Sequence, residues 1–133
     1  AAEALEAGDM VALMPEGTIP RGEAFFDPEL KGRLGAARLA QLTGAPVVPV
    51  GLWGTEKVWP RSSRLPKLLN IVDAPAVTAQ VGKPVELQHK SLEADTKRIM
   101  KAIVKQLPPE AKVRRTPTDE ELSATYPPGH RPG

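Results

Sequence analysis

Two apolar runs of strand length flank an amphipathic helix pattern in the first half of the chain, and this order constrains the fold most. The runs are residues 9–14 (DMVALM) and residues 46–53 (PVVPVGLW). Between them, residues 32–42 (GRLGAARLAQL) repeat apolar side chains at intervals of three and four, and Gly44 supplies a helix stop. The order strand, helix, strand predicts a βαβ-like unit in an α/β fold. Because both runs are continuously apolar, we expect buried strands in a mixed sheet flanked by helices.

The second half of the chain contains one further strand pattern, one long helix pattern and a proline-rich end. Residues 76–82 (AVTAQVG) alternate in polarity, which predicts a half-buried strand. Residues 91–106 predict a helix, because Ser91 is a good N-cap and acidic residues occupy the first turn. The last 26 residues contain six prolines and few large apolar groups. We therefore expect residues 1–107 to fold together and residues 108–133 to form a loosely ordered tail.

Composition bounds the chemistry that the chain can perform. A length of 133 residues, with 41% hydrophobic and 26% charged residues, suits one globular domain. The net charge of +2 is too small to indicate nucleic-acid binding, and no aromatic platform or known motif supports it. The chain has no cysteine, and its two histidines, His89 and His130, have no carboxylate in a dyad spacing. The sequence therefore predicts neither a metal site nor a catalytic histidine.

The segment MPEGTIPRG, residues 14–22, is the strongest candidate for a ligand-binding loop. It follows a predicted strand, and open α/β sheets bind ligands at the carboxyl ends of their strands. Gly17 allows close approach of the backbone, Thr18 offers a hydroxyl, and two arginines, Arg21 and Arg33, could grip a phosphate bidentately. The helix that begins near Gly32 would point N–H groups toward the same anion. Composition leaves a plain surface turn open as the alternative.

Two surfaces could meet lipid, and each has a second interpretation. A basic helix face could touch anionic headgroups, although a solvated face is favoured; it consists of Lys97, Lys101 and Lys105, with Arg98 beside it. An apolar patch could meet acyl chains or pack against further protein; it consists of Leu65, Leu68, Leu69, Ile71 and Val72. The residues leave both alternatives open.

Three motifs in order resemble the glycerolipid acyltransferases, specifically the 1-acylglycerol-3-phosphate acyltransferases. Pro15-Glu16-Gly17-Thr18 is similar to the family's Pro-Glu-Gly-Thr block, and Arg33-Leu34-Gly35 to its basic-x-Gly helix start. Residues 46–50 (PVVPV) are similar to the Pro-x-x-Pro-Val strand of the family. The later segments GTEKVWP and VTAQVGKPVEL are similar to bacterial members, so the resemblance covers about residues 4–107. It implies that residues 1–107 form the C-terminal part of the glycerolipid acyltransferase fold.

The resemblance implies transfer of a fatty acyl group from acyl-CoA or acyl-carrier protein to lysophosphatidate in phospholipid synthesis. It implies no cofactor and no metal, and a peripheral position at the cytoplasmic face of the cell membrane. In the family, a His-x-x-x-x-Asp motif supplies the base. That motif is absent here, because Ala94 stands five residues after His89 and no residue stands five after His130. Residues 1–8 (AAEALEAG) resemble the end of a helix, so we expect a missing N-terminal part and an inactive isolated chain.

The family's Glu-Gly-Thr block and nearby basic residues are associated with the glycerol phosphate of the acceptor. The substrate-binding residues that the resemblance implies are Glu16, Gly17, Thr18, Arg21, Arg33 and Gly35. The family usually has arginine directly after Glu-Gly-Thr, where this chain has Ile19, so Arg21 is the candidate replacement. The alternative function is a non-catalytic phospholipid-binding or regulatory module of the same fold.

Overall fold

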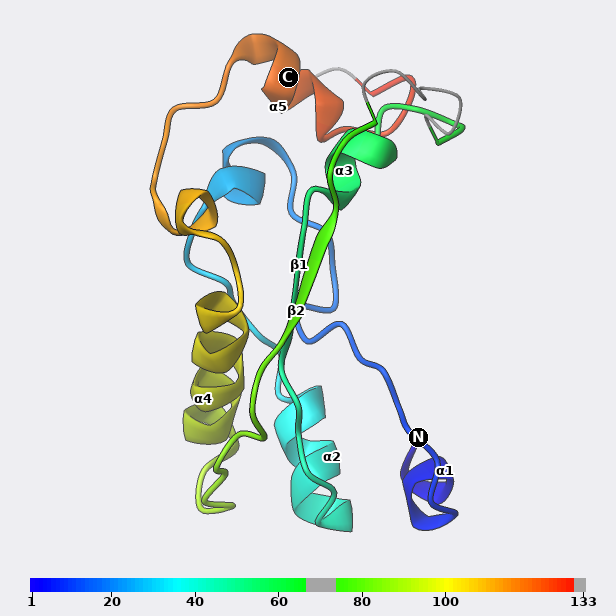
Figure 1. Cartoon of the computed structure of the whole chain (residues 1–133), viewed down its shortest axis with the longest axis vertical. Coiled ribbons are helices and arrows are strands. Elements are labelled where there is room, and N and C mark those ends of the chain that lie inside the picture. The colour runs from blue at the N-terminus through cyan, green and yellow to red at the C-terminus, as the bar shows by residue number, and fades with distance from the viewer. Residues whose placement is uncertain (67–73, 131–133) are drawn as a thin grey trace. The chain divides into compact units, whose positions relative to one another are not determined.

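The computed structural model describes residues 1–66 and 74–130, and the chain divides into two units (Figure 1). The described residues contain helices and a two-stranded antiparallel sheet joined by long loops, which confirms the predicted α/β class. Of the predicted apolar patch, Leu65 is described and exposed, and the other four members lie outside the described residues. Unit 1 consists of residues 1–18, 30–51 and 80–106, and unit 2 of residues 19–29, 52–79 and 107–133.

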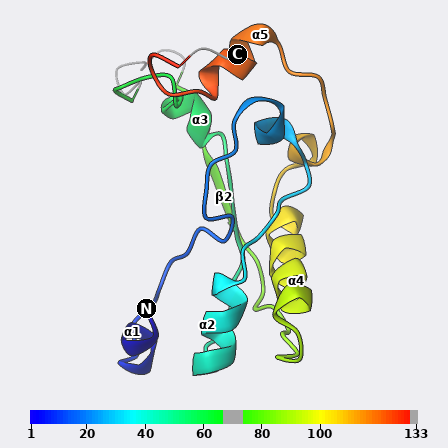
Figure 2. The same cartoon turned by 180° about the vertical axis from the view of Figure 1, so that it is seen from behind.

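Unit 1 is built around three helices. These are α1 (Ala2–Glu6), α2 (Gly35–Thr43) and α4 (Leu92–Lys105). Helix α2 contacts both α1 and α4, and both views show α2 and α4 side by side (Figure 1; Figure 2). The core includes buried small residues of α2 and larger buried residues of α4, which are Ala37, Ala40, Ile99 and Met100. Small side chains on α2 allow its backbone to approach α4 closely, which removes apolar area from water.

Both long helices lie close to their predicted ranges, because the signals that define them are local. Ser91 is the N-cap of α4, and its side chain accepts a hydrogen bond of 3.2 Å from the N–H of Ala94. Gly44 ends α2 in the left-handed conformation, with φ at 68°, and its N–H donates to the carbonyl of Ala40. The helix predictions for residues 32–42 and 91–106 are therefore confirmed, with small shifts at the ends.

The sheet pairs β1 (Val50–Trp53) with β2 (Thr78–Val81), and this confirms the strand predicted within residues 76–82. Its predicted half-burial is wrong, because all four residues of β2 are exposed. Pairing extends into unit 1, where the N–H of Gly82 donates to the carbonyl of Pro49 at 2.9 Å. Gly51 is buried, and a Cβ there would lie 2.7 Å from the backbone of Gln106. This close approach explains why glycine occupies the strand.

The predicted strand over residues 9–14 is wrong, and so is the βαβ-like unit that depends on it. Those residues have no regular structure, and Met10 is 96% exposed. An apolar run becomes a strand only where a neighbouring strand accepts its backbone hydrogen bonds, and β1 and β2 pair with each other in the described residues. The predicted burial of residues 46–53 on both faces is also wrong, because Val50 and Leu52 are exposed on a sheet of two strands.

Four short helical segments lie in the part of unit 2 that the structure describes. They are η1 (Gly22–Phe26), α3 (Thr55–Val58), η2 (Pro109–Lys112) and α5 (Asp119–Ala124). Helix α5 contacts η1 and begins with a capping box, in which the N–H of Glu121 donates to the Thr118 hydroxyl. In return, the N–H of Thr118 donates to the Glu121 carboxylate at 2.8 Å. Helix α5 was not among the expected elements, and the boundary between residues 107 and 108 stays a prediction.

Candidate functional site

The Pro-Glu-Gly-Thr block begins with a tight turn. The N–H of Gly17 donates to the carbonyl of Met14 at 3.0 Å, which closes a four-residue β-turn with Pro15 and Glu16 at its centre. Gly17 adopts φ of 67°, in the left-handed region, whereas Glu16 is not among the residues with positive φ. Proline at the second position and glycine at the fourth are typical of a type I turn. The sequence of the block therefore fixes its local shape.

Arg33 ties this turn to the start of α2. Its N–H donates to the carbonyl of Pro15 at 2.8 Å. Its side chain crosses Gly17 so closely that a Cβ at Gly17 would lie 2.7 Å from Arg33 Cδ and 2.9 Å from Nε. Arg33 is exposed, and no ion pair or side-chain hydrogen bond involves its guanidinium within residues 1–66 and 74–130. The turn thus fixes the backbone of Arg33, and the charged end of its side chain is available to an anion.

The N-terminus of α2 lies two residues after Arg33. Leu34 occupies the N-cap position and offers no side-chain acceptor to the first amides of the helix. Gly35 begins α2 and is open to solvent, since no atom lies within 4 Å of where its Cβ would stand. Uncapped amides and the helix dipole favour an anion at this end of α2.

Glu16 and Thr18 complete the predicted residues of the turn. The Glu16 carboxyl is half-buried, and this burial raises its pKa above the ordinary value. Thr18 is exposed, and none of the described residues bonds to its hydroxyl. A carboxylate can accept a hydrogen bond from a hydroxyl group, and Thr18 can donate one to a phosphate oxygen.

Arg21 belongs to unit 2, whereas the other five predicted site residues belong to unit 1. Arg21 precedes η1 as its N-cap residue, with an extended backbone and an exposed side chain. The grip of one phosphate by Arg21 and Arg33 together stays a prediction.

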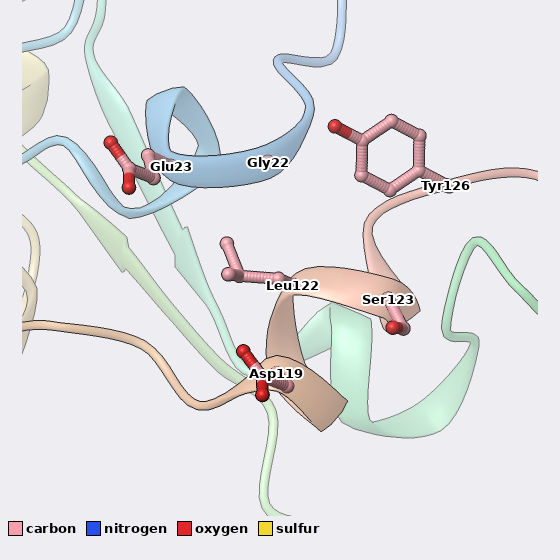
Figure 3. Close-up of a pocket in the computed structure, with 6 residues that line it drawn as sticks. All are labelled: Gly22, Glu23, Asp119, Leu122, Ser123 and Tyr126. Atoms are coloured by element: carbon pink, nitrogen blue, oxygen red, sulfur yellow. The ribbon is translucent and has the colours of Figure 1, made fainter. Parts of the chain in front are cut away.

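Two cavities in unit 2 do not suit an anion. The first, of about 300 Å³, lies between η1 and α5, and Figure 3 shows the carboxylates of Glu23 and Asp119 on its wall. Both carboxylates would repel a phosphate. The second cavity, of about 450 Å³, has two arginines, but Arg114 bonds to Asp27 and Arg115 bonds to Glu121. Its positive charges are already neutralised by carboxylates.

The described residues offer few side chains for histidine or metal chemistry. The side chain of His89 is exposed. The backbone N–H of His89 donates to the Asp95 carboxylate at 2.7 Å, and its backbone carbonyl accepts from the Gln41 side chain. Across residues 1–66 and 74–130, no three His, Cys, Asp or Glu side chains are grouped to hold a metal ion. In that part of the chain, none of the helices has the length and apolar character needed to cross a membrane.

The basic face of α4 is only partly as predicted. Lys97, Lys101 and Lys105 are exposed along the helix. Arg98, by contrast, bonds to the buried Asp95 at 2.8 Å. The arginine is therefore engaged in an intrahelical ion pair, and the exposed basic face consists of the three lysines.

Sequence reasoning missed Thr125, which contacts the segment that follows the turn. Its hydroxyl accepts a hydrogen bond of 2.8 Å from the N–H of Gly22, 103 residues away. No local pattern marks a threonine at the end of a short helix as a long-range partner. Only the spatial contact between α5 and η1 reveals it.

Residues 1–53 match the acyltransferase family model. This match supports the general acyltransferase family and, with it, a transferase class of enzyme. All six predicted site residues lie within the matched segment. No curated protein and no solved structure matches the chain.

Proposed function

We propose that this chain is the acceptor-binding part of an enzyme that transfers a fatty acyl group to lysophosphatidate. The observation that carries the proposal is Arg33. Its side chain lies over Gly17, its guanidinium has no partner among residues 1–66 and 74–130, and it precedes the uncapped start of α2. A guanidinium binds phosphate through two parallel N–H donors, and helix amides add further donors. The match of residues 1–53 to the acyltransferases supports a transferase rather than an unrelated anion-binding protein.

Each residue of the turn has a role in this proposal. Arg33 and the first amides of α2 bind the phosphate. Thr18 donates its hydroxyl to a phosphate oxygen, and Glu16 accepts a hydrogen bond from the glycerol part of the acceptor. Gly17 leaves room for the Arg33 side chain, and Gly35 leaves the start of α2 open. The site thereby orients the acceptor, and orientation lowers the barrier to attack on the acyl group.

The proposed reaction uses acyl-CoA or acyl-carrier protein as co-substrate. The base takes the proton of the free lysophosphatidate hydroxyl as the oxygen attacks the thioester carbonyl and a C–O bond forms. The C–S bond then breaks, and the departing thiolate takes the proton from the base to become the free thiol. The base would be the histidine of a His-x-x-x-x-Asp motif, which residues 1–133 do not contain. The proposal therefore requires that motif to come from outside these residues, and the isolated chain is expected to be inactive.

We place the working enzyme peripherally at the cytoplasmic face of the cell membrane, where lysophosphatidate would be found. Support comes from the exposed lysines of α4, since lysines near a surface are attracted to anionic lipid headgroups. The exposed Leu65 is a candidate for contact with acyl chains. Both surfaces remain proposals.

The second candidate function is phospholipid binding without catalysis. A non-catalytic module would use the same arginine and helix amides to hold a phospholipid. The lack of a His-x-x-x-x-Asp motif in residues 1–133 favours this alternative over a catalytic chain that acts alone.

Binding to lysophosphatidate tests the proposal directly. We expect Arg33→Ala to weaken lysophosphatidate binding by roughly tenfold or more, because a charge-assisted contact is lost. Arg38→Ala is the matched control, since Arg38 is an exposed arginine on α2 outside the predicted site. Equal affinities for the two variants would reject the phosphate site at Arg33.

An acyl-transfer assay then distinguishes the proposed enzyme from the proposed binding module. The chain is assayed with acyl-CoA and lysophosphatidate, alone and within a longer protein that supplies the His-x-x-x-x-Asp motif. Transfer only by the longer protein supports the proposed enzyme. Binding without transfer by either favours the module.

A further inference from the structure

The backbone at Gly32 lies directly against helix α4. A Cβ at Gly32 would stand 2.7 Å from both Cγ and Sδ of Met100 and 2.9 Å from Cγ2 of Thr96. Met100 is 5% exposed and Thr96 is 7% exposed, so both side chains are enclosed by other residues. Non-bonded carbon atoms make their best contact at about 3.5–4.0 Å. A side chain at Gly32 would therefore have to push aside either this segment or the buried Met100.

The turn of the candidate site contacts the next residue of the same segment. The N–H of Arg33 donates to the carbonyl of Pro15 at 2.8 Å. Helix α2 starts two residues later, and it packs on α4 with Ala37 and Ala40 buried (Figure 1; Figure 2). The backbone that enters α2 is thus fixed by α4 at Gly32 and by the turn at Arg33. All of these residues belong to unit 1.

We propose that Met100 of α4 positions Arg33 for the phosphate of the acceptor, acting through the backbone of Gly32. This inference rests on the proposed function, which assigns the phosphate to the Arg33 guanidinium. Helix α2 is docked on α4 by its own buried alanines. A displacement at Gly32 therefore moves Arg33 relative to the first amides of α2, and the two sets of donors then fit one phosphate less well. A backbone fixed before binding also loses less conformational freedom when the ligand arrives.

The first measurement asks whether α4 fixes the segment. Gly32→Ala introduces the methyl group that Met100 and Thr96 leave little space for. Amide hydrogen exchange at Arg33 reports its bond to the Pro15 carbonyl, and we expect the variant to exchange about tenfold faster there. Gly82→Ala is the matched control, because a Cβ at Gly82 would also be crowded, 2.6 Å from Nε2 of Gln106, at a position outside the candidate site.

Lysophosphatidate binding then tests the link to the phosphate. We expect Gly32→Ala to weaken binding roughly three- to tenfold, because part of a charge-assisted contact is lost. Monoacylglycerol, which lacks the phosphate, should bind the variant and the unchanged protein equally. In an Arg33→Ala background, Gly32→Ala should have no further effect on lysophosphatidate binding, since a positioning role needs the arginine that is positioned.

A second variant tests Met100 itself. Met100→Ala withdraws the side chain that supports Gly32, so lysophosphatidate binding should again weaken with Arg33 present and not with Arg33→Ala. Combining Met100→Ala with Gly32→Ala lets the new methyl group occupy the vacated space. The double variant should therefore bind about threefold more tightly than Gly32→Ala alone. Should Gly32→Ala fail to fold, Met100→Ala alone is compared in the two backgrounds.

Each contrary result identifies what has failed. Unchanged exchange at Arg33 in Gly32→Ala would overturn the positioning of this segment by α4. Faster exchange with unchanged lysophosphatidate affinity, while Arg33→Ala weakens binding, would overturn the positioning role and leave the proposed function intact. An equal loss of affinity in Gly82→Ala, or a further loss from Gly32→Ala in the Arg33→Ala background, would also overturn that role. If Arg33→Ala binds as well as the unchanged protein, the proposed function itself fails.

Discussion

The side chain of Arg33 lies over Gly17, since a Cβ at Gly17 would lie 2.7 Å from Arg33 Cδ. Gly17 also has φ of 67°, which disfavours residues with a Cβ. The backbone of the turn therefore favours glycine at this position, and a Cβ would also displace the arginine side chain that lies on it. Replacing the glycine should disturb both.

Gly17→Ala is expected to lower the free energy of unfolding by about 1–2 kcal/mol, the cost of a left-handed alanine. It should also weaken lysophosphatidate binding, because the Arg33 side chain must move away from the new methyl group. Chemical denaturation and binding titration measure the two effects.

Gly35→Ala serves as the control for stability, since nothing lies within 4 Å of its Cβ position and alanine is a better helix former. Loss of stability in Gly35→Ala, with none in Gly17→Ala, would contradict the account of the turn.

Asp95 makes the fold sensitive to acid. Hydrogen bonds from the N–H of Gln88, above all, and also from His89 and Arg98, hold the pKa of its carboxyl below the ordinary value of 3.8. A lowered pKa in the folded state means that the stabilisation is present above the unfolded pKa and is lost as the pH falls through the folded one. Asp95→Asn should therefore lower the melting temperature by several degrees at pH 7. It should also reduce the difference between the melting temperatures at pH 7 and pH 2.

Melting curves across that range check this prediction. Glu86→Gln is the control, because Glu86 is an exposed acid to which none of the described residues bonds. If the melting temperature depends on pH in the same way in Asp95→Asn and in the unchanged protein, Asp95 is not the source of the acid sensitivity.

Glu121 makes the start of α5 sensitive to acid through its pair with Arg115. The Arg115 guanidinium, first, and then the N–H of Thr118 lower the pKa of its carboxyl to about 2. The ordinary value is 4.5, so this contribution to folding is complete above pH 4.5 and disappears as the pH falls toward 2. Both partners are at least partly exposed, which allows salt to screen the pair.

Glu121→Gln should loosen α5 and speed trypsin cleavage after Arg115 and Arg21, with little change in the melting temperature of the whole chain. The same loosening should be seen in the unchanged protein as the pH is lowered from 4.5 toward 2, followed by hydrogen exchange at Gly22. Glu120→Gln, at the neighbouring exposed position, is the control. Faster cleavage in both variants would point to the loss of negative charge rather than of the pair.

The sequence predicted two helices from local signals and missed the contacts that are not local. Helix α4 follows from the Ser91 cap and a 3.6-residue periodicity, whereas α5 was not predicted although its capping box, Thr118 to Glu121, is a local signal. The false strand over residues 9–14 shows the limit, because a strand depends on a partner elsewhere in the chain.

The candidate site also contains a local feature, which the sequence indicates, and long-range contacts, which it does not. The turn of Met14 to Gly17 follows from its own residues, since proline and glycine stand where a type I turn favours them. The contact of Arg33 with Gly17 joins residues 16 positions apart, and that of Gly22 with Thr125 joins residues 103 apart. Nothing in the local composition distinguishes those partners from other arginines and threonines, so only the fold identifies them.

Glu16 should be a position where binding and stability oppose each other. Its half-buried carboxyl has a raised pKa because burial penalises the charged form. The sign follows from this direction: a group with a raised pKa favours folding below the unfolded pKa, about 4.5, and that contribution is lost as the pH rises through the folded value. At pH 7 the charged Glu16 carboxylate therefore slightly destabilises the folded state.

Glu16→Gln removes the charge and keeps the shape, so the melting temperature should rise slightly at pH 7 and stay unchanged at pH 3. Binding of lysophosphatidate should weaken by roughly tenfold, since an amide oxygen accepts a hydrogen bond from the acceptor less strongly than a carboxylate does. Melting curves at the two pH values and a binding titration at pH 7 make the comparison, with Glu23→Gln as the exposed control. A variant that binds as well as the unchanged protein would remove Glu16 from the acceptor site, because the burial of its charge would then serve no purpose in binding.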